Sequence, residues 1–232
     1  MQNFREDFDN RSNEILEYLS LVKFIDNSGS EITSSDDNKN KQQITADVRK
    51  TLKGTVYILL YNLVESTMRE AISYIHESIY NKQIGFDDLC SPLKKEIIKR
   101  LKSDAISIDN IVRKNSKGLS FDITLTTFNK QKLFSGNIDR EEINLKSKIY
   151  GFSTQCEYSQ TKHGEKLSTV KRNRNDLAHG NVSFSEIGKN ITYQELECTC
   201  NEVIAYLDAI TSNIETYIER ASYLDKKDEN VA

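Results

Sequence analysis

One short stretch, Lys171 to Gly180, holds the side chains of this chain that are best suited to acid–base chemistry. Arg174 supplies a permanent cation with a planar fork of donors, and His179 can give or take a proton near neutral pH. Together they are the minimum set for cleaving a phosphodiester without a metal. The imidazole would transfer protons, while the guanidinium would stabilise the charge that builds on the phosphate.

The spacing of the two residues limits how they can work together. They lie at the end of an expected helix, from about Glu165 to His179, which Gly180 then ends. Residues five apart on a helix diverge by about 140°, so one site requires either an unwound helix end or a second chain. Both residues would also stabilise the helix by bonding its last carbonyl groups. From spacing alone, this structural role is the simpler explanation.

The surroundings of this stretch are basic, although the chain has a formal net charge of -3. Only Glu165 opposes a run of basic side chains: Lys162, His163, Lys166, Lys171, Arg172 and Arg174. The overall balance excludes a uniformly basic nucleic-acid coat but allows a local basic site. Within this run, Lys166, Lys171 and Arg172 are the candidates for contacting RNA.

Helices account for most of the remaining pattern. A single proline and nine glycines argue against an all-β chain. Apolar residues at helical spacing predict helices over about 4–25, 43–80, 92–101, 139–150 and 165–179, and a last long helix that begins with a capping box at Thr192 and Glu195. Val48 belongs to the apolar pattern of 43–80, Ser91 is the expected N-cap of 92–101, and Gly151 is expected to end 139–150. The helix over 43–80 is apolar nearly all round near its middle, so we expect it at the centre of a bundle. Within it, Gly54 would allow a kink or a close approach of another helix.

Two regions interrupt the helices. Residues from about 26 to 41 are polar and low in complexity, which predicts a flexible loop. Residues from about 102 to 134 form an insertion that we expect to be irregular. Within it, Phe121 to Leu125 alternates with period two, which is typical of a short strand or hairpin.

Metal, cofactor and membrane signals are missing from the sequence. The four cysteines are not spaced as a zinc set, and no phosphate-cradling glycine loop is present. No apolar run is long enough to cross a bilayer, and the first residues are too polar for a signal peptide. We therefore expect a cytoplasmic protein without cofactor, metal or membrane contact.

The motif itself resembles a known signature. Arg174 and Asn175, then His179 after three further residues, then Gly180, resemble the signature of the HEPN superfamily (higher eukaryotes and prokaryotes nucleotide-binding domains). The segment from Tyr61 to Arg69 is similar to the central helix of that family. Residues 134–139 and 171–184 resemble a bacterial branch associated with defence islands and restriction systems, so the resemblance covers nearly the whole chain.

This resemblance implies an all-α, up-and-down helical bundle, with residues 1–232 as a single domain. It implies a homodimer in which two motif copies face each other, and a metal-independent endoribonuclease that cuts RNA by internal attack of the 2′-hydroxyl. His179 would transfer protons, Arg174 would stabilise the phosphate and Asn175 would orient the site. Such enzymes act as toxins or antiviral effectors, so an antitoxin or another defence-system protein is a further expected partner.

Auxiliary residues and rival functions complete the predictions. Glu65 and Arg69, one turn apart on the central helix, form either an ordinary helical ion pair or a buried pair facing the motif. Asp176 is a third auxiliary candidate. A rival function is a non-catalytic HEPN module that binds RNA, nucleotide or a partner protein. Another is an accessory subunit of a restriction or toxin–antitoxin system.

Overall fold

The computed structural model describes residues 2–26, 29–33, 41–103, 111, 118–127, 133–134 and 136–225, and these are almost entirely helical. The α-helices are α1 (Gln2–Ile25), α2 (Ala46–Asn81), α3 (Ser91–Ser103), α5 (Leu119–Thr126), α6 (Arg140–Tyr150), α7 (Tyr158–Thr161), α8 (Lys166–Ala178), α9 (Phe184–Lys189) and α10 (Tyr193–Glu219). Two single 3-10 turns, η1 (Phe86–Asp88) and η3 (Lys162–Gly164), and two strands, β1 (Glu31–Thr33) and β2 (Lys41–Gln43), complete the elements. The predicted all-α helical bundle is confirmed.

The chain divides into two compact units, and each is described by itself. Unit 1 comprises residues 1–67, 138–140 and 156–208, and unit 2 comprises residues 68–137, 141–155 and 209–232. The boundary between the units therefore falls within α2 and within α10. The single domain expected over residues 1–232 stays a prediction.

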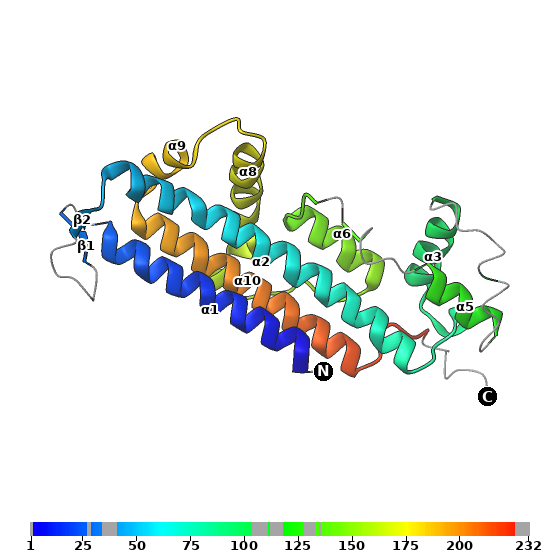
Figure 1. Ribbon diagram of the computed structural model, residues 1–232. Helices are drawn as coiled ribbons and strands as arrows, with labels where there is room; N and C mark the ends of the chain where they lie inside the picture. Colours follow the sequence, from blue (N-terminus) through cyan, green and yellow to red (C-terminus); the bar gives the residue numbers. More distant parts are fainter. Residues whose placement is uncertain are drawn as a thin grey trace. The chain divides into compact units, whose positions relative to one another are not determined.

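Unit 1 is built on α1 and the first parts of α2 and α10 (Figure 1). The apolar stripe predicted on the first helix is buried at every position: Phe4, Phe8, Ile15, Leu19 and Val22. Polar contacts join the helices as well. The Tyr18 hydroxyl donates to the Leu52 carbonyl over 3.1 Å, and Arg5 pairs with Asp208 on α10. Unit 1 thus has a continuous helical core against which the shorter helices pack.

Helix α9 lies directly on α2, and glycines make this possible. A Cβ at Gly54 would overlap the Phe184 carbonyl, and a Cβ at Gly188 would overlap the Lys50 carbonyl. The close helix approach predicted at Gly54 is therefore confirmed. Helix α9 itself was not predicted, because six residues carry little periodicity. Its capping box, in which Ser183 and Glu186 bond each other's backbone amides, is the sequence signal that could have found it.

Unit 2 has a core rich in aromatic residues. Tyr150 and Tyr223 are almost completely buried. The Tyr217 hydroxyl donates to the Tyr150 carbonyl, and the Tyr223 hydroxyl lies 3.4 Å from Ser78 Oγ. Helix α6 ends at Gly151, as predicted, with a positive φ of 90°. These contacts give unit 2 a packed interior of its own.

The short strand or hairpin predicted at Phe121–Leu125 is wrong, because these residues form helix α5. The period-two alternation favoured a strand, but tertiary contacts favour a helix at this position. The Phe121 ring stacks on Tyr80 with centroids 5.9 Å apart, and Ser120 Oγ accepts from the Asp87 amide. The Thr124 hydroxyl also donates to the Ser120 carbonyl four residues earlier, a bond that threonine side chains form within helices. Residues 104–110, 112–117 and 128–132 of the insertion lie outside the described residues.

Smaller predictions also need correction. Part of the loop expected over about 26–41 forms β1, which pairs antiparallel with β2; residues 27–28 and 34–40 lie outside the described residues. Val48, counted in the apolar pattern of the central helix, is 45% exposed. Helix α3 begins at Ser91, and the Cys90 carbonyl accepts its first bond from Lys94, so the cap lies one residue before the predicted serine. The capping box at Thr192 and Glu195 is confirmed by reciprocal bonds of 2.9 and 3.2 Å.

Within the described ranges, no helix is both long enough and apolar enough to span a bilayer.

Candidate functional site

Helix α8 positions the motif through a buried stripe and a tight turn before it. Leu167, Val170 and Leu177 face the core of unit 1. Ahead of the helix, Lys162, His163 and Gly164 all have positive φ. Gly164 is buried, and a larger residue would not fit here because a Cβ would lie 2.9 Å from the Tyr206 ring. This turn and the stripe fix the rotation of α8, and therefore which of its polar residues face α2.

The end of α8 is set by Gly180, as predicted. Gly180 has a φ of 69°, and its amide donates to the Leu177 carbonyl over 3.1 Å. The Asn181 amide donates to the Asp176 carbonyl over 2.9 Å, which completes a Schellman termination. His179 is the last residue before this turn. Its backbone is still helical and its amide donates to the Asn175 carbonyl, so the helix does not unwind before it.

Arg174 is held against α2 by several contacts. Its guanidinium carbon lies 3.6 Å from the centre of the Tyr61 ring, close enough for a cation–π interaction. Nη1 donates to Asn175 Oδ1 over 2.8 Å, and Nη2 lies 3.4 Å from Glu65 Oε2. The Arg174 side chain is 21% exposed. The structure therefore brings together three of the predicted site residues, Arg174, Asn175 and Glu65.

Tyr61 is the residue at this site that sequence reasoning did not assign. Its hydroxyl oxygen accepts a hydrogen bond of 3.0 Å from the buried Ile138 amide. Burial raises the pKa of Tyr61, and this outweighs the opposing effects of the Ile138 bond and the nearby Arg174. The phenol therefore stays neutral and its ring serves as a platform for the guanidinium. Its position four residues before Glu65 puts both on one helix face, which is the signal that could have found it.

His179 and Arg174 do not meet in one chain by unwinding of the helix. The imidazole of His179 is exposed at the end of α8, while Arg174 turns to Tyr61 and Glu65 on α2. Because α8 stays regular as far as His179, the divergence of about 140° between the two side chains persists. The unwound helix end, one of the two arrangements expected from the sequence, is therefore not adopted.

The remaining predicted residues occupy different places. Lys171 pairs with Asp139, just before α6, rather than pointing into open solvent. Asp176 is half-buried and accepts from Asn181 Nδ2 over 3.3 Å. Arg69 is half-buried on α2 and belongs to unit 2. The auxiliary roles of Asp176 and Arg69 therefore stay predictions.

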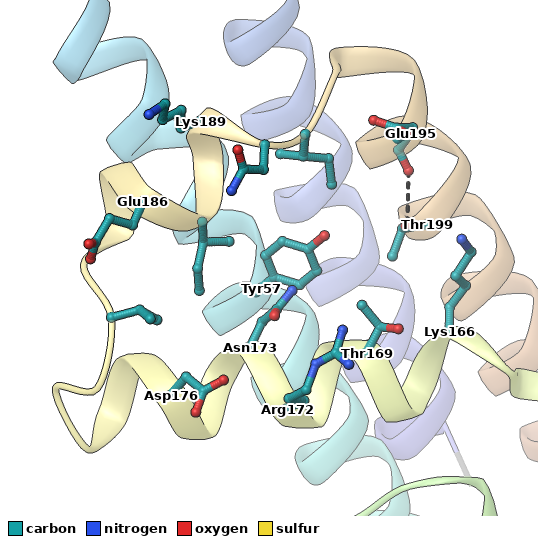
Figure 2. A pocket seen from close by; sticks show the side chains of 14 residues that line it. Tyr57, Lys166, Thr169, Arg172, Asn173, Asp176, Glu186, Lys189, Glu195 and Thr199 are labelled. Atoms are coloured by element: carbon teal, nitrogen blue, oxygen red, sulfur yellow. Dashed lines mark hydrogen bonds between the residues drawn. The ribbon is translucent and has the colours of Figure 1, made fainter.

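Beside the motif lies a cavity of about 620 Å³ within unit 1 (Figure 2). Helix α8 lines it with Lys166, Thr169, Arg172, Asn173 and Asp176, and α2 contributes Tyr57. Its other wall is the chain after α8, with Val182, Glu186, Ile187, Lys189, Asn190 and Ile191, followed by Glu195 and Thr199 of α10. Two of the three predicted RNA contacts, Lys166 and Arg172, thus share one pocket.

The pocket and Arg174 lie on different faces of α8. A rotation of about 100° per residue groups positions 166, 169, 173 and 176 together and places 171 and 174 on the far side. The side chains agree: Asn173 lines the cavity, whereas Arg174 lies on Tyr61. Figure 2 shows Tyr57, Asn173 and Arg172 pointing into the cavity. Helix α8 therefore presents two distinct polar surfaces.

Tyr57 and Asn173 form the polar floor of the pocket. Tyr57 is 3% exposed, and burial raises its pKa to about 12, against a hydrogen bond from the Asn173 side chain that lowers it. The phenol is thus neutral at physiological pH. Among the described residues, no group of three or more His, Cys, Asp or Glu side chains is placed to hold a metal ion.

The helical fold, with Arg174, Asn175 and His179 at a glycine-ended helix, defines a HEPN-type domain. A sequence model of the family described as HEPN_MAE_28990-like HEPN matches residues 1–223, nearly the whole chain. The chain belongs to this HEPN family. The comparisons with curated proteins and with solved structures gave no match to this chain.

Proposed function

We propose that this protein is a metal-independent endoribonuclease of the HEPN type, which cleaves RNA by attack of the 2′-hydroxyl on the adjacent phosphate. One observation carries the proposal. Arg174 is fixed on the Tyr61 ring and by Asn175 and Glu65, in the same helix that presents an exposed His179 at its end. Family membership over residues 1–223 supports the same function class.

Arg174 would stabilise the phosphate. The Tyr61 ring and two hydrogen-bonding partners hold the guanidinium in one orientation. A cation fixed in advance stabilises developing negative charge without reorganising during the reaction. Asn175, whose Oδ1 accepts from Arg174 Nη1, orients that charge.

His179 would transfer the protons. Cleavage needs a base for the 2′-hydroxyl and an acid for the departing 5′-oxygen. The imidazole of His179 can serve as either group in turn, and the regular helix α8 keeps it turned away from the Arg174 of the same chain. A homodimer in which two motifs face each other would pair the His179 of each chain with the Arg174 of the other, which gives two equivalent sites. We therefore propose a composite site shared by two chains.

The proposed setting is a toxin or an antiviral effector, with cellular or foreign RNA as the substrate. The support is the resemblance of residues 134–139 and 171–184 to a defence-associated bacterial branch. A toxic nuclease must be held inactive until it is needed, so an antitoxin or another defence-system protein is the expected partner.

A second candidate function is a non-catalytic HEPN module that binds RNA, nucleotide or a partner protein, including an accessory role in a restriction or toxin–antitoxin system. The ion pair between Arg174 and Glu65 favours this second function, because the Glu65 carboxylate offsets part of the positive charge that Arg174 would otherwise present to a phosphate. Glu65 is 28% exposed, so solvent and substrate can both reach the pair.

The first experiment is a cleavage assay with purified protein and labelled RNA in the presence of EDTA. We expect chelator-resistant cutting and products that end in 2′,3′-cyclic phosphate, since internal attack leaves that group. RNA that is bound but remains intact would favour the non-catalytic module. Cutting that stops with EDTA would contradict the proposed mechanism.

A mixing experiment tests the composite site. Arg174→Ala and His179→Ala are each expected to be inactive, but a heterodimer of the two contains one site with both native residues. Random pairing makes half of the dimers mixed, each with one of two sites intact, so co-refolded protein should recover about a quarter of the native rate, provided that sites act independently. Failure to recover activity, with mixed dimers shown by mass spectrometry, would place the site within one chain.

A further inference from the structure

The cavity beside α8 has the size and the walls of a small-molecule site rather than of a packing defect. Its volume of about 620 Å³ falls within the range of ligand pockets. Val182, Ile187 and Ile191 line it and are each only half-buried. Aliphatic side chains left partly open in this way offer surfaces for the flat faces of an aromatic ring.

Three cations and three carboxylates line the pocket, so its formal charge is balanced. Each carboxylate accepts a hydrogen bond from a neutral group of the protein. Glu186 bonds the Ser183 amide over 2.6 Å, Glu195 bonds the Thr192 amide over 2.9 Å, and Asp176 accepts from Asn181. These amide bonds lower the pKa of both glutamates and keep them ionised, with smaller contributions from Lys189 at Glu186 and from Lys166 at Glu195. Within the part of the chain that the structure describes, Lys166, Arg172 and Lys189 form no direct ion pair, so their charged ends can turn toward a phosphate.

The floor of the pocket offers hydrogen bonds to a flat polar edge. The Asn173 amide carries both a donor and an acceptor, and it bonds the neutral Tyr57 hydroxyl beside it. An amide of this kind can hydrogen-bond the edge of a nucleobase, and the pattern of donors and acceptors on that edge differs between bases. Figure 2 shows Asn173 and Tyr57 adjacent within the cavity, with Arg172 beside them.

The pocket also adjoins His179 along the chain. Asp176 and Val182 line it, and they flank the glycine turn that carries the exposed imidazole. The Val182 amide lies 3.5 Å from the Asp176 carbonyl, which closes that turn. A nucleotide held in the pocket would therefore have its phosphate near the end of α8, next to the proposed proton-transfer group.

We infer that this pocket is a nucleotide subsite for the RNA substrate, which takes one unpaired base. Asn173 reads the base edge, the three aliphatic side chains contact its faces, and Arg172 and Lys166 bind the adjacent phosphates. This inference rests on the proposed ribonuclease function, because it makes the pocket the part that selects where RNA is cut. Asn173 would then select the base in the pocket that adjoins His179, while the Arg174 of the same chain lies on the other face of α8.

The test separates binding from cleavage. A short RNA with 2′-O-methyl groups cannot attack its own phosphate, so it reports binding alone. We expect Asn173→Ala to weaken its binding about tenfold, as for loss of a base-edge contact. Arg172→Gln should weaken binding about fivefold and reduce the slope of log K against log salt by about one. Matched controls are Asn201→Ala and Arg220→Gln, exposed residues outside the pocket, which should leave binding unchanged.

The cleavage arm uses unmodified RNA of mixed sequence and mapped product ends. Wild-type cuts should share one base identity beside the scissile phosphate. Asn173→Ala should lose that preference, whereas Arg172→Gln should lower the rate at all sites alike. Thermal melting of each variant within about 3 °C of the wild type excludes misfolding as the cause. Competition of nucleoside monophosphates with the short RNA, tested alongside, shows whether a free nucleotide enters the pocket.

The outcomes separate the two proposals. A wild-type protein that cuts no RNA overturns the nuclease function, while loss of oligonucleotide binding in Asn173→Ala still supports a nucleotide pocket. Wild-type cutting that keeps the same preference and affinity in Asn173→Ala overturns the subsite. Competition by mononucleotides with no oligonucleotide binding also overturns it, because the pocket would then serve free nucleotides rather than the substrate.

Discussion

Two regions of this protein hold a histidine in opposite settings. In unit 2, His76 Nε2 lies 2.9 Å from the Tyr150 hydroxyl, and the two rings meet edge to face. Burial there lowers the pKa of His76 to about 3, with a smaller contribution from Arg100. In unit 1, His179 is exposed at the end of α8. One imidazole is locked neutral among aromatic rings, and the other faces solvent.

The two histidines therefore differ in role. His76 contributes to the packing of unit 2, whereas His179 in unit 1 is accessible to solvent. A strongly shifted pKa is often a sign of a functional site, yet here the shifted histidine is bonded to Tyr150 in the aromatic core of unit 2. In unit 1, Arg174, Asn175 and Glu65 are half-exposed and bonded to one another. The exposure of His179, rather than the size of a pKa shift, therefore points to unit 1 as the functional unit.

The largest expected effect is on His179. His179→Ala should lower the initial rate of RNA cleavage about a thousandfold, because it removes the proposed acid–base group. His163→Asn is the matched control: this residue is also an exposed histidine, and asparagine tolerates its left-handed backbone. Its rate should stay within about twofold of the wild type. Equal losses in both variants would remove the assigned role of His179.

Arg174→Lys sharpens the role of the guanidinium. The charge remains, but the planar fork that bonds Asn175 and Glu65 is lost. We expect the cleavage rate to fall about a hundredfold, as on removal of an oriented donor at a developing anion, with little change in melting temperature. A lysine variant that cuts at the native rate would show that a point charge is sufficient there.

His76 should make stability depend on pH. Its pKa is about 3 in the folded state against 6.5 normally, so the unfolded chain binds more protons between these values. Stability is therefore complete above pH 6.5 and falls progressively as the pH drops toward 3. At about pH 5 the loss should be about 2 kcal/mol. Urea unfolding of the wild type and His76→Gln at several pH values measures it, and the variant should lack this part of the slope.

Tyr61→Phe has the smallest expected effect. The ring under Arg174 remains, but the buried Ile138 amide loses its acceptor. The free energy of unfolding should fall by about 1 to 2 kcal/mol, while cleavage stays within about threefold of the native rate. Chemical denaturation and the cleavage assay check the two parts. A large loss of activity at unchanged stability would instead give the Tyr61 hydroxyl a direct role in the reaction.

The sequence predicted the helices well where an apolar stripe or a cap was strong. The first helix, the long central helix, and the ends of α6 and α8 at Gly151 and Gly180 were found because periodicity and glycine conformations are local properties. Helix α5 was missed for the opposite reason. Its alternating residues resemble a strand, and only contacts with Tyr80 and Asp87, far away in the sequence, make a helix the better packing.

The sequence by itself determined the motif residues, their basic surroundings and the helix end that presents His179, because each depends on residue type and spacing. Only the tertiary structure decided the partners of these side chains. It placed Tyr61 beneath Arg174, directed Lys171 to Asp139, and opened a pocket with Arg172 and Asn173 on the other side of α8. The physical reason is that the rotation of a helix is fixed by the core against which it packs, and distant residues supply that core.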